Sequence, residues 1–270
     1  MVIRQSLSIL QQAHAEYKPY ATVAMFSGGT DSLAALHAVL RMGEKIDYVM
    51  HVHTATGLPE TLEYVRRYVE KLGIPYLEPS AGTAYEDYVL RKGFFGRGER
   101  AHTFAYHILK RQRMRAGLAT IRQGKRGRNI LLVNGGRRQE SQNRMVTMKE
   151  PIKKDGSNIW VNVINEWTKF DCMDFIHDEK LEVNPVSALL HRSGECMCGT
   201  MQSHEERKEA AFWFPEWGKW LDNLEQQVNA NGHWWGWGDA TPEAVKWIKA
   251  GQLQFQPMCV GCMARKVEVA

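Results

Sequence analysis

The chain has 270 residues, 44% of them hydrophobic, and its 35 basic and 30 acidic side chains leave a formal net charge of +5. This length accommodates one large α/β domain, or one domain with a small appendage. No apolar run reaches the roughly 18 residues of a membrane-spanning helix. Residues 1–19 show neither the apolar core nor the cleavage site of a secretory signal, so we expect a cytoplasmic protein with no membrane partner.

The positive charge is concentrated in one basic stretch, residues 91–128. Twelve lysines and arginines fall there against a single acid, Glu99, which gives a local balance of +11 and leaves the rest of the chain acidic. So large and localised an excess favours a surface for a polyanion such as DNA. An ordinary solvated basic helix and loop is the alternative.

Short apolar runs alternate with helical patterns through the first half of the chain. Strands are predicted at residues 21–26, 45–54, 74–80 and 129–136, and helices at 31–43 and 59–73. The second helix begins at Pro59 and carries Lys71 near its end, as the helix dipole favours. This alternation predicts an α/β fold, with a doubly wound parallel sheet covered by helices on both faces.

The composition changes near residue 190. Residues 191–270 hold four of the five cysteines and seven of the nine tryptophans. We therefore predict an α/β domain at 1–190, with the basic stretch as an insert, and a small cysteine- and tryptophan-rich segment at 191–270. Tryptophans in a small segment most often form its core. Stacking on nucleobases is the alternative.

A glycine-rich turn follows the first predicted strand and opens the first predicted helix. It reads Ser27-Gly28-Gly29-Thr30-Asp31-Ser32. The glycines let the backbone approach a ligand closely, and the amides of the turn and of the helix N-terminus converge on one point, which suits an anion. The hydroxyl groups add donors. Asp31 suits a Mg²⁺ ion that accompanies phosphates, and the lysine-bearing Walker pattern is absent.

This turn resembles the SGGxDS loop of the PP-loop ATP pyrophosphatase superfamily. The resemblance implies an adenine nucleotide alpha-hydrolase-like fold that binds ATP with Mg²⁺. It also implies adenylylation of a substrate oxygen with release of pyrophosphate. Asp31 and Ser32 are the expected catalytic residues, and the expected nucleotide contacts also include Phe26, Ser27, Gly28, Gly29 and Thr30.

Two later stretches resemble the phosphoadenosine phosphosulfate (PAPS) reductase branch of that superfamily. "HTATGLPET" at 53–61 is similar to its "DTG…PET" segment, with Ala55-Thr56 in place of the usual Asp-Thr, and "NGGRRQESQNRM" at 134–145 is similar to its arginine-rich segment. A helix that begins near Arg138 places residues 137, 141 and 144 near one face. The resemblance, which extends to about residue 200, implies cofactor contacts from His53, Thr54, Gly135, Arg137, Arg138, Ser141 and Arg144. The arginines and the Ser141 hydroxyl suit phosphate or sulfate.

Four cysteines form two close pairs, Cys196 with Cys198 and Cys259 with Cys262. Two such pairs in a cytosolic chain predict one four-thiolate site, for zinc or for a [4Fe–4S] cluster. The resemblance favours iron–sulfur, because several sulfur-handling PP-loop proteins carry such clusters. Cys172 falls on an amphipathic segment and is predicted to lie in the core.

The combined features resemble the ATP pyrophosphatase component of bacterial DNA phosphorothioation systems. That resemblance implies DNA as acceptor, bound by the basic stretch 91–128, with a cysteine desulfurase as sulfur donor and other modification-complex subunits as partners. Three alternatives stay open. They are reduction of adenylyl sulfate or its 3′-phosphorylated form, thiolation of tRNA, and nucleotide binding without catalysis.

Overall fold

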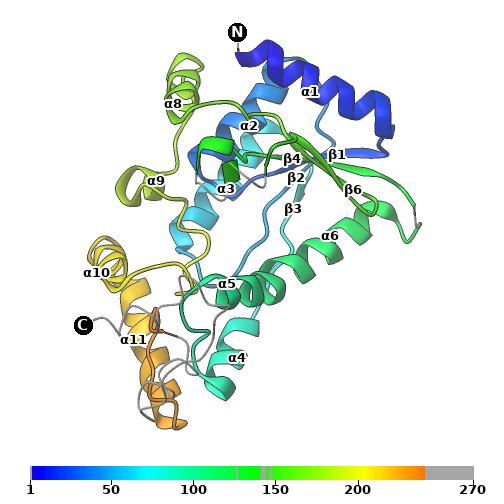
Figure 1. Ribbon diagram of the computed structural model, residues 1–270. Coiled ribbons are helices and arrows are strands. Elements are labelled where there is room, and N and C mark those ends of the chain that lie inside the picture. The colour runs from blue at the N-terminus through cyan, green and yellow to red at the C-terminus, as the bar shows by residue number, and fades with distance from the viewer. Residues whose placement is uncertain (1, 126, 141–143, 146–147, 241–270) are drawn as a thin grey trace. The chain divides into compact units, whose positions relative to one another are not determined.

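The computed structural model describes residues 2–125, 127–140, 144–145 and 148–240 (Figure 1). The chain divides into two compact units. Unit 1 comprises Met1–Ser80 and Gln112–Cys196, and unit 2 comprises Ala81–Arg111 and Met197–Ala270. None of the described helices is both long and apolar enough to span a membrane.

Unit 1 is built on a six-stranded sheet of order β3-β2-β1-β4-β6-β5. Its strands are β1 Ala21–Met25, β2 Tyr48–Met50, β3 Tyr76–Leu77, β4 Ile130–Asn134, β5 Ile152–Asp155 and β6 Asn158–Asn162. All neighbouring strands are parallel except β5 and β6, which form an antiparallel pair. This confirms the predicted α/β fold. The strand order reverses between β1 and β4, and open α/β sheets bind their ligands beyond the carboxyl ends of the strands at such a point.

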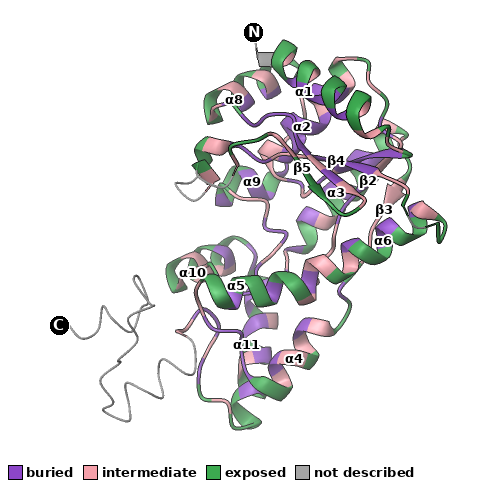
Figure 2. Ribbon diagram, turned by 45° about the vertical axis from the view of Figure 1, so that its right-hand side comes forward, coloured by how far each residue is buried: buried purple, intermediate pink, exposed green. Residues whose placement is uncertain are grey.

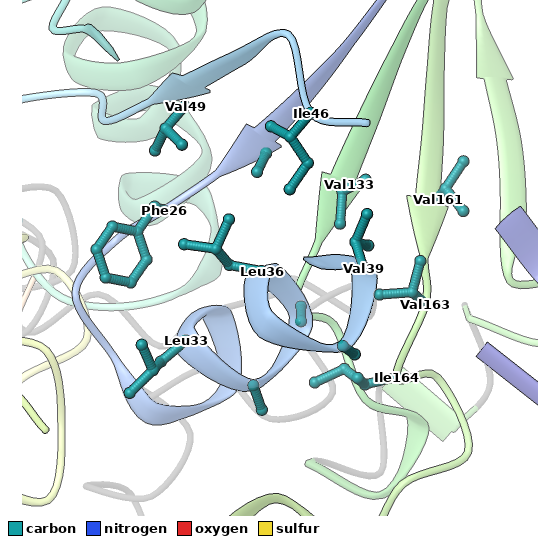
Figure 3. Close-up of a cluster of buried hydrophobic side chains, with 14 of the residues drawn as sticks. Phe26, Leu33, Leu36, Val39, Ile46, Val49, Val133, Val161, Val163 and Ile164 are labelled. Atoms are coloured by element: carbon teal, nitrogen blue, oxygen red, sulfur yellow. The ribbon is translucent and has the colours of Figure 1, made fainter. Parts of the chain in front are cut away.

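Helices cover both faces of this sheet. One face carries α1 Val2–Tyr17, α2 Thr30–Arg41, α3 Pro59–Leu72 and α8 Lys169–Asp178, and the other carries α6 Gln112–Arg122. Side chains of β4 alternate accordingly: Leu131 and Val133 pack among the first group, whereas Ile130 and Leu132 pack with α6. Figure 3 shows part of the first core, where Val39 of α2 lies near Val133 and Leu36 lies between Phe26 and Val39. Because both faces are buried at the centre of the sheet, β1 and β4 are apolar at nearly every position.

Two short helices, η2 Arg138–Glu140 and α9 Pro185–Leu190, are also described in unit 1. The predicted strands at 21–26, 45–54, 74–80 and 129–136 contain β1 to β4, and the predicted helices at 31–43 and 59–73 match α2 and α3. Gly73 ends α3 in the left-handed conformation. The local patterns therefore predict these six elements correctly, whereas α1 was not predicted.

The described part of unit 2 is helical. It contains α4 Ala84–Lys92, α5 Glu99–Tyr106, the π-helical turn η1 His107–Arg111, α10 His204–Trp213 and α11 Pro215–Ala230. Helix α11 packs against α10 and α4. Trp217, Trp235 and Trp237 are buried in this unit, and the indole N–H groups of the last two donate to the main-chain oxygens of Phe94 and Met197, each at 2.9 Å. These three tryptophans are core residues, whereas Trp213 and Trp234 are each 48% exposed.

Candidate nucleotide-binding site

The glycine-rich turn joins β1 to α2, beside the place where the strand order reverses. Gly28 has φ +77°, and a Cβ atom there would lie 3.0 Å from Val65 Cγ2, so this position requires glycine. Ser32 Oγ donates to the Gly29 oxygen at 2.9 Å and lies 3.1 Å from Ser27 Oγ. The two serines therefore brace the turn.

Helix α2 begins without a side-chain cap. Its N-cap residue Gly29 makes no capping hydrogen bond, whereas Thr168 and Ser203 form complete capping boxes on α8 and α10. The first amide groups of α2 and the positive end of its dipole are therefore directed at the turn. This arrangement suits a phosphate group.

Asp31 lies between two cations. Arg137 Nε donates to Asp31 Oδ2 at 2.8 Å, and Lys169 Nζ lies 3.1 Å from Asp31 Oδ1 and 2.5 Å from Thr30 Oγ1. The Arg137 side chain is 7% exposed and that of Lys169 is 50% exposed. Arg137 is thus a fixed partner, while Lys169 reaches solvent and has room to change partner. Two cations against one carboxylate give this part of the turn a net positive charge, which suits a polyphosphate.

Lys169 lies outside the predicted site residues. It occupies the first position of α8, directly after the N-cap Thr168. A cation in the first turn of a helix opposes the helix dipole, which favours acids there. A lysine at this unfavourable position is the feature of the sequence that could have identified Lys169 as a site residue. This lysine supplies the cation that the turn itself lacks.

Gly135 brings the loop after β4 against the start of α2. A Cβ atom at this position would lie 2.6 Å from the Asp31 main-chain oxygen and 2.7 Å from the Ser32 nitrogen. Both neighbours are main-chain atoms, which cannot turn aside as a side chain does. The glycine therefore allows Arg137, two residues later, to reach Asp31.

We expect Gly135→Ala to push the two loops apart. The variant should lose about 1–3 kcal/mol of unfolding free energy and bind ATP at least about tenfold more weakly. Urea denaturation and ATP titration measure the two effects. Gly156→Ala is the control, because a Cβ there meets nothing within 4 Å although φ is +60°. An equal loss of ATP affinity in both variants would contradict the role assigned to Gly135.

Comparison with known proteins identifies the family. Residues 21–200 match the phosphoadenosine phosphosulfate reductase domain. The chain belongs to this family. Membership confirms the predicted superfamily, its PAPS reductase branch and its fold, and it places the chain among enzymes that use adenine nucleotides.

No curated protein matches the chain. Three solved structures are similar to it at low identity. PAPS reductase from Candida auris, in a phosphate complex, has a TM-score of 0.48 at 15% identity and covers 68% of this chain and 84% of its own. NMN synthetase from Francisella tularensis has a TM-score of 0.48 at 14% identity, and the match covers 96% of this chain and 99% of the synthetase. The U34-tRNA thiolase NcsA from Methanococcus maripaludis, with its [4Fe–4S] cluster, has a TM-score of 0.44 at 13% identity. The match covers 94% of this chain and 88% of the thiolase.

Two residues that the family resemblance implicates have buried side chains. Phe26 is 1% exposed and packs against the rings of Tyr64 and Tyr68, at centroid distances of 6.2 and 5.7 Å. Thr54 is fully buried, and its hydroxyl donates to the Glu195 main-chain oxygen at 2.7 Å. These side chains position the loops after β1 and β2.

His53 lies at the edge of the same sheet. Its Nδ1 atom is 3.2 Å from Ser80 Oγ. Burial lowers the pKa of His53, and the neighbouring His51 lowers it further. His53 is therefore neutral at pH 7, because its ordinary value already lies below that pH. It can therefore form hydrogen bonds but carries no charge.

The arginine-rich segment follows β4. Arg138 pairs with Glu166 at 3.2 Å, and Arg144 pairs with Glu140. Arg137 precedes η2 and turns to Asp31. Ser141 lies outside the described residues. Of the three arginines, Arg137 is thus the one that the structure brings to the glycine-rich turn.

The predicted metal site involves both described and undescribed residues. Cys196 and Cys198 form no disulfide, and Cys198 is 4% exposed with its sulfur 3.3 Å from Thr200 Oγ1. Cys259 and Cys262 lie outside the described residues. Within the part of the chain that the structure describes, no three histidines, cysteines or acids are grouped as metal ligands. The four-thiolate site stays a prediction.

Cys172 lies in the core of unit 1, as predicted, with no exposed surface. Burial raises the pKa of its thiol to about 12, and the negative charge of Asp31 contributes to the rise. The reactive thiolate is therefore scarce at pH 8. We expect iodoacetamide to spare Cys172 in the folded protein and to modify it after unfolding in denaturant, as peptide mass spectrometry measures. Rapid labelling of the folded protein at Cys172 would contradict this assignment.

Proposed function

We propose that this protein uses ATP to activate a phosphate of the DNA backbone, so that sulfur can replace one of its non-bridging oxygens. One observation carries the activation step: Asp31 lies between Arg137 and Lys169 at the uncapped start of α2, in a PAPS reductase family domain. A carboxylate flanked by two cations beside an anion-binding helix start suits the β and γ phosphates of ATP.

The activation step has a simple atom balance. An oxygen of the DNA phosphate attacks the α phosphorus of ATP and forms a new P–O bond. The bond from that phosphorus to the α–β bridging oxygen breaks, and pyrophosphate leaves with the electron pair. In this proposal the first amides of α2 and the Lys169 ammonium hold the departing phosphates, while Arg137 fixes the orientation of Asp31.

The residues at the turn also fit Mg²⁺ bound together with ATP. Asp31 is 20% exposed and offers one carboxylate, and Mg²⁺ in nucleotide sites commonly takes one or two carboxylates plus substrate phosphates. Asp31 would hold the ion, and Lys169 would turn to the phosphates. When bound there, the ion would supply positive charge that offsets the charge of the departing pyrophosphate.

The acceptor is proposed from the basic stretch. Arg122 and Arg128 serve unit 1 itself: Arg122 donates to the Ser157 oxygen at 3.2 Å, and the Arg128 guanidinium lies 4.0 Å over the ring of Tyr20. Among the described residues, no carboxylate pairs with Arg91, Lys92, Arg97, Arg100, Arg111, Arg113, Arg115 or Lys125. Cations without acidic partners suit the phosphates of DNA.

Sulfur would then displace AMP from the activated phosphate. The donor must supply sulfur at the oxidation level of sulfide, for example a persulfide together with a two-electron reductant. A cysteine desulfurase is the proposed source, and other subunits of a modification complex are proposed partners. The four-cysteine site, with [4Fe–4S] or zinc, is proposed as a further cofactor site, and no step is assigned to it.

The family match over residues 21–200 favours a second candidate, reduction of adenylyl sulfate or PAPS. Pyrophosphate release from Mg-ATP, measured with DNA, with tRNA and without nucleic acid, separates the candidates. We expect release that requires DNA and falls steeply between about 50 and 200 mM salt. Sulfite formation from either sulfate nucleotide with thioredoxin, without DNA, would establish the second candidate. Release that tRNA stimulates and DNA does not would establish tRNA as the acceptor.

A further inference from the structure

The exposed side of α5 and η1 in unit 2 combines an aromatic ring with cations. Arg100, Phe104 and His107 follow one another at helical spacing, and Arg111 ends the π-helical turn that continues α5. Figure 2 shows exposed positions along α5, while Ala101, Ala105 and Leu109 are buried on its other side. Phe104 is 46% exposed on the outer side.

The Phe104 ring is held in a defined orientation. It meets the rings of Tyr88 and Phe95 nearly edge to face, at centroid distances of 5.4 and 5.8 Å. Tyr88 and Phe95 themselves stack at 4.6 Å with an interplanar angle of 18°, and Phe95 is 8% exposed. A ring supported in this way loses little conformational freedom when a ligand covers its exposed side, so that contact costs little entropy.

The segment that carries Phe104 is rich in positive charge. Residues 91–111 contain six lysines and arginines and one acid, Glu99. Among the described residues, no carboxylate pairs with Arg100 or Arg111. Such a surface attracts a polyanion.

We propose that Phe104 stacks with an unpaired base of a DNA strand, while Arg100 and Arg111 contact the phosphates on either side of it. This rests on the proposed function, which names DNA as the acceptor. Basic grooves with aromatic platforms bind single strands because every base has a π face, whereas bases in a duplex already stack on one another. The surface therefore distinguishes a single strand, or a locally opened site, from an intact duplex.

The test measures DNA binding without ATP, by fluorescence anisotropy with a labelled 20-nucleotide strand and with its duplex. We expect the wild-type protein to prefer the single strand. Phe104→Ala should weaken single-strand binding about 5- to 100-fold and leave duplex binding within about twofold. Phe104→Trp should retain the affinity, and a 2-aminopurine base in the strand should be quenched by the wild-type protein and not by Phe104→Ala.

Phe212→Ala is the matched control, because Phe212 is also in unit 2 and is 75% exposed. The proposal is overturned if Phe104→Ala binds the strand like the wild type, if Phe212→Ala loses as much, or if an RNA strand of the same sequence binds at least tenfold more tightly. Pyrophosphate release tests the proposed function separately. DNA-dependent release with no effect of Phe104→Ala overturns this inference alone, and Phe104-dependent binding without release overturns the proposed function alone.

Discussion

Replacing Asp31 by asparagine will reduce ATP-dependent pyrophosphate release by about 10³-fold, and the protein will stay folded. The change removes the negative charge that would hold Mg²⁺ and keeps the size of the side chain. Its amide oxygen can still accept a hydrogen bond from Arg137 Nε, which now donates to Asp31 Oδ2 at 2.8 Å. A steady-state pyrophosphate assay measures the loss, and circular dichroism with urea denaturation measures the fold.

The Asp31→Ala variant separates the effect of Asp31 on stability from its effect on pyrophosphate release. The Arg137 side chain is 7% exposed, so Asp31→Ala leaves a nearly buried guanidinium without its carboxylate. We expect this variant to lose about 2–4 kcal/mol of unfolding free energy, clearly more than the asparagine variant. Both variants should be equally inactive. Release at more than about a tenth of the wild-type rate in Asp31→Asn would contradict the catalytic assignment.

The elements around the candidate site follow local sequence rules. The run before Ser27 is apolar because β1 is buried on both faces, and α3 begins at a proline and ends at a left-handed Gly73. Each of these signals lies within a few residues of the element that it specifies. Alternating strands and helices then restrict the topology to a parallel sheet. That is why the fold class could be predicted from the sequence.

Other elements depend on contacts that a local pattern does not reveal. Strand β5 lies at the edge of the sheet and exposes three of its four residues, Lys153, Lys154 and Asp155, so it has no apolar run. Helix α1 precedes the predicted elements, and its buried residues, among them Leu10 and Ala13, pack into the core that α2 and α3 share. Both elements are defined by tertiary packing.

The candidate site shows the same division. The turn at residues 27–32 could be predicted because its glycines, hydroxyls and following helix are contiguous. The two ion pairs of Asp31 could not be predicted from the turn, because Arg137 and Lys169 are 106 and 138 residues from Asp31 along the chain. The turn, which lacks a lysine, predicts an anion site made of amides, hydroxyls and a Mg²⁺ ion at Asp31. The structure adds a lysine from the start of α8.

We therefore expect a second large effect on pyrophosphate release from substitution of Lys169. If its ammonium holds the departing phosphates, Lys169→Met will lower kcat for pyrophosphate release about 10²-fold. If Lys169 only neutralises Asp31, the variant will change stability and ATP affinity and leave kcat within about twofold. Lys169→Arg should retain part of the activity because it keeps the charge. Lys180→Met is the control, since Lys180 is an exposed lysine just beyond the same helix.

The dependence of the reaction on Mg²⁺ tests independently whether Lys169 leaves Asp31 when the metal ion binds there. In the structure, Lys169 Nζ lies 3.1 Å from Asp31 Oδ1 and so competes with any metal ion for that carboxylate. Removing the lysine removes the competitor, and the half-saturating Mg²⁺ concentration should fall about 3- to 10-fold while kcat also falls. If Lys169 had only a structural role, the half-saturating Mg²⁺ concentration would not fall together with kcat. Unchanged Mg²⁺ dependence with reduced kcat would mean that Lys169 acts on the phosphates without exchanging with the ion at Asp31.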